Sequence, residues 1–138
     1  MIKFKKIVPE AVEPRAMTAG SAAADLVAIS MTEYPEFIEY DTGLAFEIPP
    51  GWVGILAARS SLSGKDLLLA NGIGVLDSDY RNSVKFRFKR IDGGGCTYEV
   101  GDRVGQIMVL PIGSPLFEEA SELSSTQRGT GGFGSTGN

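Results

Sequence analysis

The sequence predicts an all-β fold, a sandwich or barrel of short strands, and three observations support this class. Turn-forming residues recur at short intervals, as at Pro49-Pro50-Gly51 and in the glycine run 93–95. Residues 83–89 alternate polar and apolar side chains, which is the period of a half-buried strand. No segment sustains a helical period over three turns. Short, evenly spaced strands with glycine and proline between them are typical of sandwiches and barrels.

The expected strands follow one another between these turn signals, over residues 44–48, 52–56, 83–89, 97–100 and 104–110. We expect residues 1–123 to form one β-barrel domain around a single core. Residues 124–138 are expected to form a glycine-rich C-terminal arm, which is mobile by itself because glycine has much conformational freedom to lose.

Length and composition exclude several classes of protein. With 138 residues and 43% hydrophobic content, the chain can bury one real core. It has no apolar run of the roughly 18 residues that a membrane span needs, and its first residues lack the apolar stretch of a secretion signal. Cys96 is the sole cysteine, so no disulfide can form within the chain. We therefore expect a cytoplasmic protein, or one in the host cytoplasm if it is viral, without a membrane partner.

The charged residues narrow the chemistry further. A net charge of -4 argues against nucleic acid as a partner, because non-specific binding to it needs a broad basic surface. A small phosphorylated ligand needs only a few local cations. The chain contains no histidine, so a general base near neutral pH must be a carboxylate, a shifted lysine or tyrosine, or a metal-bound hydroxide. Catalysis by serine–histidine or cysteine–histidine pairs is excluded.

The last eleven residues, 128–138, combine five glycines with one arginine and one aromatic ring. Arg128, Ser135 and Thr136 can bind phosphate oxygens, and the glycine amides can approach an anion closely. Phe133 offers a flat face for a base. This composition predicts an arm that becomes ordered over a nucleotide.

Two further segments place reactive side chains at the ends of expected strands. Residues 71–82 gather Asp77, Asp79 and Tyr80, either as an acidic hairpin turn or as a site that holds Asp77 as a base for water. Residues 58–65 gather two cations and three hydroxyls, either as a solvated loop or as a phosphate cradle. Their spacing is not that of a Walker A loop.

Taken in order, these segments resemble the trimeric dUTPase family in five places. The matching stretches are residues 20–26, 59–62, 71–82, 101–106 and 128–137. The third keeps the Gly-x-x-Asp-x-Asp-Tyr core, and the resemblance covers nearly the whole chain. The sequence departs from the family pattern, without losing a catalytic group, at Ala23, Ser61, Asn82 and Gly105.

The resemblance implies a jelly-roll β-barrel that assembles as a homotrimer, with each active site at a subunit interface and an arm closing over it. The implied activity is that of a dUTP diphosphatase, which converts dUTP and water to dUMP and pyrophosphate. This reaction lowers dUTP and supplies dUMP for dTMP synthesis. Asp77 is the implied catalytic residue, which orients and deprotonates the water that attacks the α-phosphorus in line. Mg²⁺ is the implied cofactor, and Asp25 would hold it through water only.

The ring of Tyr80 would leave no room for a 2′-hydroxyl, and Phe133 would stack over the base. The full set of substrate-binding residues that the resemblance implies is Arg59, Ser60, Ser61, Asn71, Gly74, Asp77, Tyr80, Gln106, Arg128, Phe133, Gly134, Ser135 and Thr136. The resemblance leaves open the roles of Lys65, Arg81 and Arg103, of which Arg103 is either a structural ion-pair residue or a ligand-binding residue.

Two alternatives remain at this point. Arg59-Ser60-Ser61 also resembles the dCTP deaminases of the same superfamily, although these lack the Asp-x-Asp-Tyr pattern. The second alternative is a non-catalytic nucleotide-binding or regulatory module on the same scaffold.

Overall fold

The computed structural model describes residues 1–91, 95–113 and 116–132, and the regular elements in these ranges are antiparallel strands and one short 3-10 helix. In chain order they are β1 (Lys3–Lys6), β2 (Ala24–Val27), β3 (Ser30–Glu33), β4 (Ile38–Asp41), β5 (Leu44–Glu47), β6 (Trp52–Ala57), η1 (Ser60–Gly64), β7 (Leu67–Leu69), β8 (Gly74–Leu76), β9 (Lys85–Arg90) and β10 (Arg103–Pro111). No helix in these ranges has the length and apolar character needed to cross a membrane.

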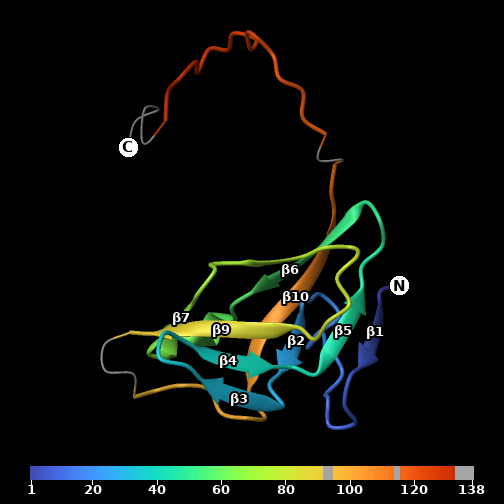
Figure 1. Ribbon diagram of the computed structural model, residues 1–138, viewed down its shortest axis with the longest axis vertical. Helices are drawn as coiled ribbons and strands as arrows, with labels where there is room; N and C mark the ends of the chain where they lie inside the picture. The colour runs from blue at the N-terminus through green and yellow to red at the C-terminus, as the bar shows by residue number, and fades with distance from the viewer. Residues whose placement is uncertain (92–94, 114–115, 133–138) are drawn as a thin grey trace.

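The strands form two four-stranded sheets and a two-stranded ribbon. One sheet has the order β2-β10-β6-β8 and the other the order β3-β4-β9-β7, while β1 pairs with β5. In Figure 1 the sheet with β4 and β9 lies in front of β10 and β6, so the two sheets form the layers of a sandwich. The expectation of an all-β sandwich or barrel is confirmed.

The core lies between the sheets and follows from alternation along the strands. On β9, Phe86 and Phe88 are buried, whereas Lys85, Arg87 and Lys89 face outward. The opposite sheet contributes buried residues that include Leu26, Val104 and Ile107. The two layers meet closely at Gly105, where an added Cβ would overlap the ring of Phe86.

Four of the five expected strands are confirmed with small shifts of their ends, as β5, β6, β9 and β10. The expected strand at 97–100 is wrong. That segment is fixed by individual contacts: the carbonyl of Tyr98 accepts a 2.8 Å bond from the hydroxyl of Tyr40, and Lys65 Nζ donates to the carbonyl of Thr97. Its alternating pattern reflects burial of the Tyr98 ring beneath the loop.

After β10 the chain leaves the body, and residues 116–132 extend away from it in Figure 1. Three large apolar side chains of this segment, Leu116, Phe117 and Leu123, are 85%, 96% and 89% exposed. The boundary expected at residue 123 between barrel and arm stays a prediction.

Candidate active site

The sheet β2-β10-β6-β8 gathers the predicted anion-binding residues at one end. Its register places Asp25 opposite Gln106, and Gln106 opposite Ala57, the last residue of β6. Arg59 and Ser60 follow directly where the chain turns into η1. Asp25, Arg59, Ser60 and Gln106 line one hollow of about 400 Å³. Residues from three separate matching stretches therefore share one site on a single chain, here called the anion hollow.

Asp25, which lines this hollow, holds two arginine side chains. Its buried carboxylate accepts a 3.0 Å bond from Arg59 Nε and a 3.1 Å bond from Arg103 Nη1. Arg59 Nη1 also donates to the hydroxyl of Ser61 at 3.0 Å. These contacts fix the plane of the Arg59 guanidinium, so that its charge is held in place before a ligand arrives. Ser61 thus contacts Arg59, and Arg103 forms an ion pair with Asp25, which was one of its two expected roles.

Gln106 is oriented in a similar way, because its side-chain nitrogen donates to the carbonyl of Ala58 at 2.9 Å. This bond uses one of the two amide protons and ties β10 to the loop after β6. The cation of Lys65 points elsewhere, toward the carbonyl of Thr97 and over the ring of Tyr98 at 5.1 Å. Lys65 therefore holds the loop 96–98 rather than the anion hollow.

A second hollow, of about 570 Å³, lies beside β8 and is called here the hairpin hollow. Asn71, Gly74 and Tyr80 line it, together with Leu76 and Val84. Gly74 allows β8 to lie close to β6, because a Cβ there would come within 2.9 Å of the Leu56 Cβ. The Tyr80 ring is 41% exposed, and its hydroxyl donates to the carbonyl of Ser83 at 3.3 Å.

Asp77 directly follows β8 and lies exposed in a third hollow, of about 570 Å³, beside Trp52, Ser78 and Asp79. The amide of Tyr80 donates to the carbonyl of Asp77 at 3.2 Å, which closes a turn. Arg81 steadies this turn from outside, because its Nη1 donates to the carbonyls of Ser78 and Tyr80 at 2.8 and 2.9 Å. The role of Arg81 in this structure is to hold the turn that carries Asp77 and Tyr80.

Asp77 and the anion hollow lie at opposite ends of one sheet. Leu76 pairs with Gly54 and Gly74 pairs with Leu56, so Asp77 continues toward the Trp52 end of β6, whereas Arg59 follows its Ala57 end. The five residue steps from Trp52 to Ala57 span about 17 Å along β6. Within one chain, Asp77 and Arg59 therefore belong to separate hollows.

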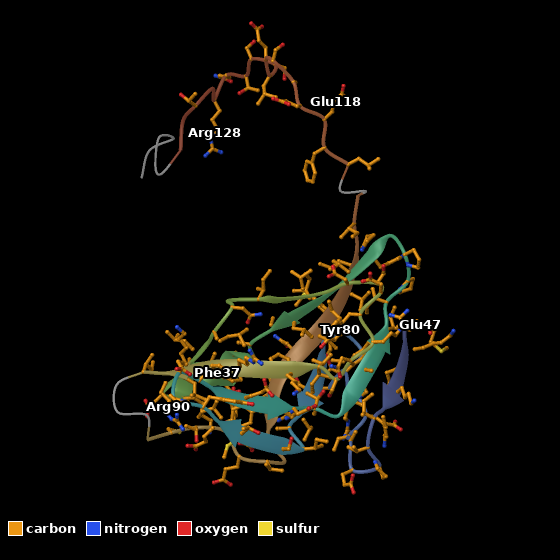
Figure 2. The ribbon with its side chains drawn as sticks, viewed as in Figure 1. Phe37, Glu47, Tyr80, Arg90, Glu118 and Arg128 are labelled. Atoms are coloured by element: carbon orange, nitrogen blue, oxygen red, sulfur yellow. The ribbon has the colours of Figure 1, made fainter. Side chains whose placement is uncertain are left out.

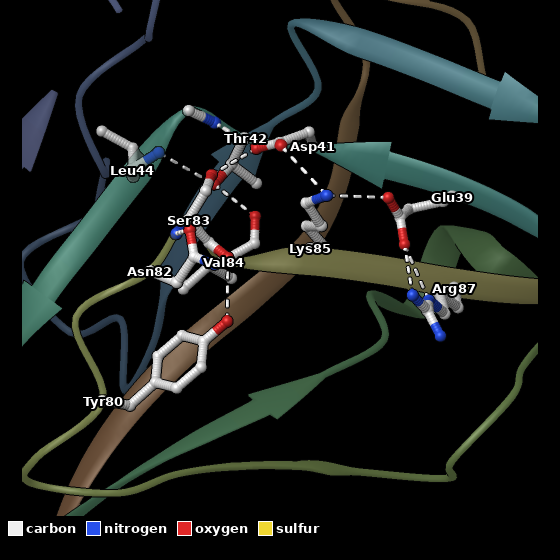
Figure 3. A network of polar contacts seen from close by, with 11 residues as sticks. Glu39, Asp41, Thr42, Leu44, Tyr80, Asn82, Ser83, Val84, Lys85 and Arg87 are labelled. Atoms are coloured by element: carbon white, nitrogen blue, oxygen red, sulfur yellow. Dashed lines mark hydrogen bonds and ion pairs between the residues drawn. The ribbon is translucent and has the colours of Figure 1, made fainter. Parts of the chain in front are cut away.

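Charged residues of β4 and β9 form the polar wall of the hairpin hollow (Figure 3). Glu39 is 6% exposed and accepts a 2.9 Å bond from Lys85 Nζ and a 2.7 Å bond from Arg87 Nη2. Burial by itself would raise the pKa of Glu39, but the hydrogen bonds from Lys85 and Arg87 outweigh it and hold the pKa below its usual value. The same bond raises the pKa of Lys85. Sequence reasoning missed this group, because a lone glutamate in a strand gives no sign of burial.

The arm is described only in part. Arg128 lies on the segment beyond the body (Figure 2), where its Nε donates to the carbonyl of Gly131 at 3.0 Å. Gly129 has a φ of 52°, a left-handed turn conformation that suits glycine. The remaining predicted arm residues, Phe133, Gly134, Ser135 and Thr136, lie outside the described residues.

The chain is similar to known proteins both in sequence and in fold. The family model described as dUTPase matches residues 10–137. The deoxyuridine 5'-triphosphate nucleotidohydrolase of Escherichia phage T5 is 42% identical over 124 residues, which cover 89% of this chain and 82% of that protein. The solved structure of the Staphylococcus bacteriophage 80alpha dUTPase with dUPNHPP superposes with a TM-score of 0.85 at 24% identity, over 100% of this chain and 99% of that one.

A variant dUTPase from phage phi11 of S. aureus, described with a structural Mg(II) ion, has a TM-score of 0.76 at 21% identity over 91% of this chain and 99% of that one. These structures share the fold, and the family model and the phage T5 relative extend the match to nearly the whole sequence. The chain therefore belongs to the dUTPase family.

Proposed function

We propose that this protein is a dUTP diphosphatase, which hydrolyses dUTP to dUMP and pyrophosphate. The proposal rests on one observation: this member of the dUTPase family has two separate groups of residues that together would form a complete site. One is the turn with Asp77 and Tyr80 beside the hairpin hollow, and the other is the anion hollow braced by Asp25. The first suits a nucleoside and a water, and the second suits phosphate oxygens.

Asp77 acts on the water that attacks the α-phosphorus in line. Carboxylates are weak bases at neutral pH. Rate acceleration therefore comes mainly from holding the water and the phosphate in line and from neutralising the charge that develops on phosphate oxygens. Arg81 supports Asp77 by fixing the turn that carries it.

The anion hollow supplies the neutralising charge. Arg59 is oriented by Asp25, and Ser60 and Gln106 add hydrogen-bond donors beside it. The arm completes this set with Arg128, Gly134, Ser135 and Thr136, while Phe133 covers the base. Closure of the arm over the triphosphate removes water from the site, which strengthens each of these contacts.

Asp77 lies beside the Trp52 end of β6 and Arg59 follows its Ala57 end, and the strand between these ends is about 17 Å long. A working site would therefore need the anion hollow of a second chain. A homotrimer satisfies this need, with the hairpin of one subunit facing the anion hollow of the next and an arm covering both. The exposed apolar residues Leu116, Phe117 and Leu123 also favour contact with another chain.

Mg²⁺ fits the residues of the anion hollow. This ion prefers oxygen ligands and is usually bound through one or two carboxylates together with substrate phosphates. Asp25 is the carboxylate in the hollow, and each of its oxygens accepts a single bond from an arginine, which leaves further lone pairs for a metal-bound water. Bound there, the ion would neutralise phosphate charge. Within the described ranges no three acidic, cysteine or histidine side chains form a cage by themselves, so phosphate oxygens would supply the other ligands.

Nucleoside selection belongs to the hairpin hollow. Asn71 and Gly74 lie where main-chain groups can recognise uracil, and the Tyr80 ring would pack against the deoxyribose. Removal of dUTP and supply of dUMP for dTMP synthesis would follow from this activity. A cytoplasmic location, expected from the sequence, stays a prediction.

The experiment is a turnover assay of the purified protein with Mg²⁺ on dUTP, dTTP, dCTP, UTP and dATP. Pyrophosphate release from dUTP alone is the expected result, and Asp77→Asn should abolish nearly all of it while leaving dUMP binding measurable. Ammonia release from dCTP would point to a deaminase instead. Tight binding of dUTP without turnover by a folded trimer would point to a non-catalytic module.

A further inference from the structure

Among the described residues, the side chain of Tyr80 makes one hydrogen bond, and this bond limits the position of its ring. Its hydroxyl donates to the carbonyl of Ser83 at 3.3 Å, near the long limit for such a bond. The ring is otherwise 41% exposed at the hairpin hollow. Whatever fixes the carbonyl of Ser83 therefore also limits where the ring can lie.

Ser83 is fixed by the turn that follows β4. It is 6% exposed, and its hydroxyl donates to Asp41 Oδ1, which also accepts the amide of Gly43 at 2.8 Å. The neighbouring Thr42 donates both its amide and its hydroxyl to the carbonyl of Val84, at 3.1 and 2.8 Å. The turn at 41–44 thus holds residues 83 and 84 through several hydrogen bonds. Among those described, the bond to Asp41 is made by a side chain, that of Ser83, and the others are made by the backbone of Val84.

Asp41 is held in turn by the charged residues behind it (Figure 3). Lys85 Nζ lies 3.6 Å from Asp41 Oδ2 and 2.9 Å from Glu39 Oε1, and Arg87 holds the other oxygen of Glu39 at 2.7 Å. The strand register places Asp41 opposite Lys85 and Glu39 opposite Arg87. A continuous chain of polar contacts therefore runs from Arg87 to the hydroxyl of Tyr80.

We propose that Asp41 and Ser83, with Lys85 behind them, are positioning residues that set the place of the Tyr80 ring and thereby the discrimination between deoxyribose and ribose. None of the three needs to touch the substrate. A looser Ser83 carbonyl lets the ring retreat, and the space that opens accommodates a 2′-hydroxyl. The inference rests on the proposed function and assigns to it residues outside the matching stretches 59–62, 71–82 and 101–106.

The first test is Ser83→Ala, which removes the hydroxyl that meets Asp41. A net hydrogen bond of ordinary strength corresponds to about a three- to tenfold change. We expect the ratio of kcat/KM for dUTP to that for UTP to fall by about this factor, mainly through faster turnover of UTP. Ser83→Thr keeps the hydroxyl and should restore the ratio. A purely structural role would slow both substrates together and leave the ratio unchanged, which would overturn the inference.

A matched pair of variants tests the charged residues behind Asp41. Lys85→Met and Lys89→Met each remove one cation from the outer face of β9, but Lys89 lies outside the chain of contacts. Only Lys85→Met should lower the dUTP-to-UTP ratio, and equal ratios for the two variants would contradict the proposal. Binding of dUMP and of UMP, measured by calorimetry, gives the same comparison without turnover. A wild-type protein that fails to hydrolyse dUTP would defeat the proposed function, whereas the two binding constants would still decide the positioning role.

Discussion

The protein contains two buried carboxylates that each hold two cationic side chains, and the two groups differ in what their cations face. Asp25 holds Arg59 and Arg103, and Arg59 lines the anion hollow. Glu39 holds Lys85 and Arg87 at the wall of the hairpin hollow, where Lys85 is directed toward Asp41. The same arrangement lies in two settings: beside the anion hollow, where we propose that it orients a charge for a substrate, and between two strands, where it contacts the turn at Asp41.

We expect the largest loss of activity when Asp25 is replaced. Asp25→Asn keeps the shape of the side chain but removes the charge that orients Arg59, so the guanidinium is no longer held for the phosphate. We expect kcat/KM for dUTP to fall by about 100-fold, similar to the loss of a donor that stabilises a transition state. Steady-state kinetics measures this, with thermal unfolding as a check on the fold. A variant that stays folded and loses less than about twofold would show that Arg59 needs no such orientation.

The corresponding substitution of Glu39 should lower the stability of the fold more than it lowers activity. Glu39→Gln leaves Lys85 and Arg87 without their buried partner. Removing one member of a fully buried pair costs about 3–5 kcal/mol, but Lys85 and Arg87 are 40% and 56% exposed, so water screens much of this. We expect a loss of about 1–2 kcal/mol in the free energy of unfolding. Urea denaturation measures it, and an unchanged midpoint would mean that the pair contributes no net stability.

The pH dependence of that loss sharpens the contrast. Hydrogen bonds from Lys85 and Arg87 hold the pKa of Glu39 below its ordinary value of 4.5, so the folded state binds the proton less readily than the unfolded state. The stabilisation is therefore complete above the ordinary value and is lost as the pH falls through the lowered pKa of the folded protein. The difference in unfolding free energy between wild type and Glu39→Gln should shrink in acid and vanish below that pKa. A difference that stays constant down to about pH 3 would contradict this linkage.

The two groups also show what the sequence could and could not predict. β9 was predicted because Phe86 and Phe88 alternate with charged residues that face solvent. β4 was not predicted, although Ile38 and Tyr40 alternate with Glu39 and Asp41, because this alternation spans only four residues. The burial of Glu39 depends on partners on a strand more than 40 residues away. Alternation misled at 97–100, where Tyr98 is buried by contacts of its side chain and carbonyl rather than by strand pairing.

For the candidate site too, some features could be predicted from the sequence and others could not. The order of the matching stretches was enough to predict that Asp25, Arg59, Ser60 and Gln106 act together, and the structure brings all four to one hollow. The distance of Asp77 from that hollow follows from the register of β6 and β8, which pairing between strands decides and residue types do not encode locally. The role of Arg81 depends on carbonyl partners and became evident only in the folded chain. For Arg103 the sequence allowed an ion pair, and the structure identifies Asp25 as its partner.

The smallest predicted effect separates the two cations that Asp25 holds. Among the described residues, the side chain of Arg103 is 42% exposed and contacts Asp25 Oδ2, whereas that of Arg59 is 21% exposed and contacts both Asp25 Oδ1 and Ser61. In Arg103→Gln the carboxylate keeps its bond to Arg59, so we expect kcat/KM for dUTP to fall by only about threefold. Arg59→Gln, measured beside it, should lose about 100-fold, because it removes the charge that meets the phosphate. Equal losses in the two variants would mean that Asp25 orients both cations toward the substrate. In that case Arg103 would bind the substrate as Arg59 does, rather than only hold Asp25 in place.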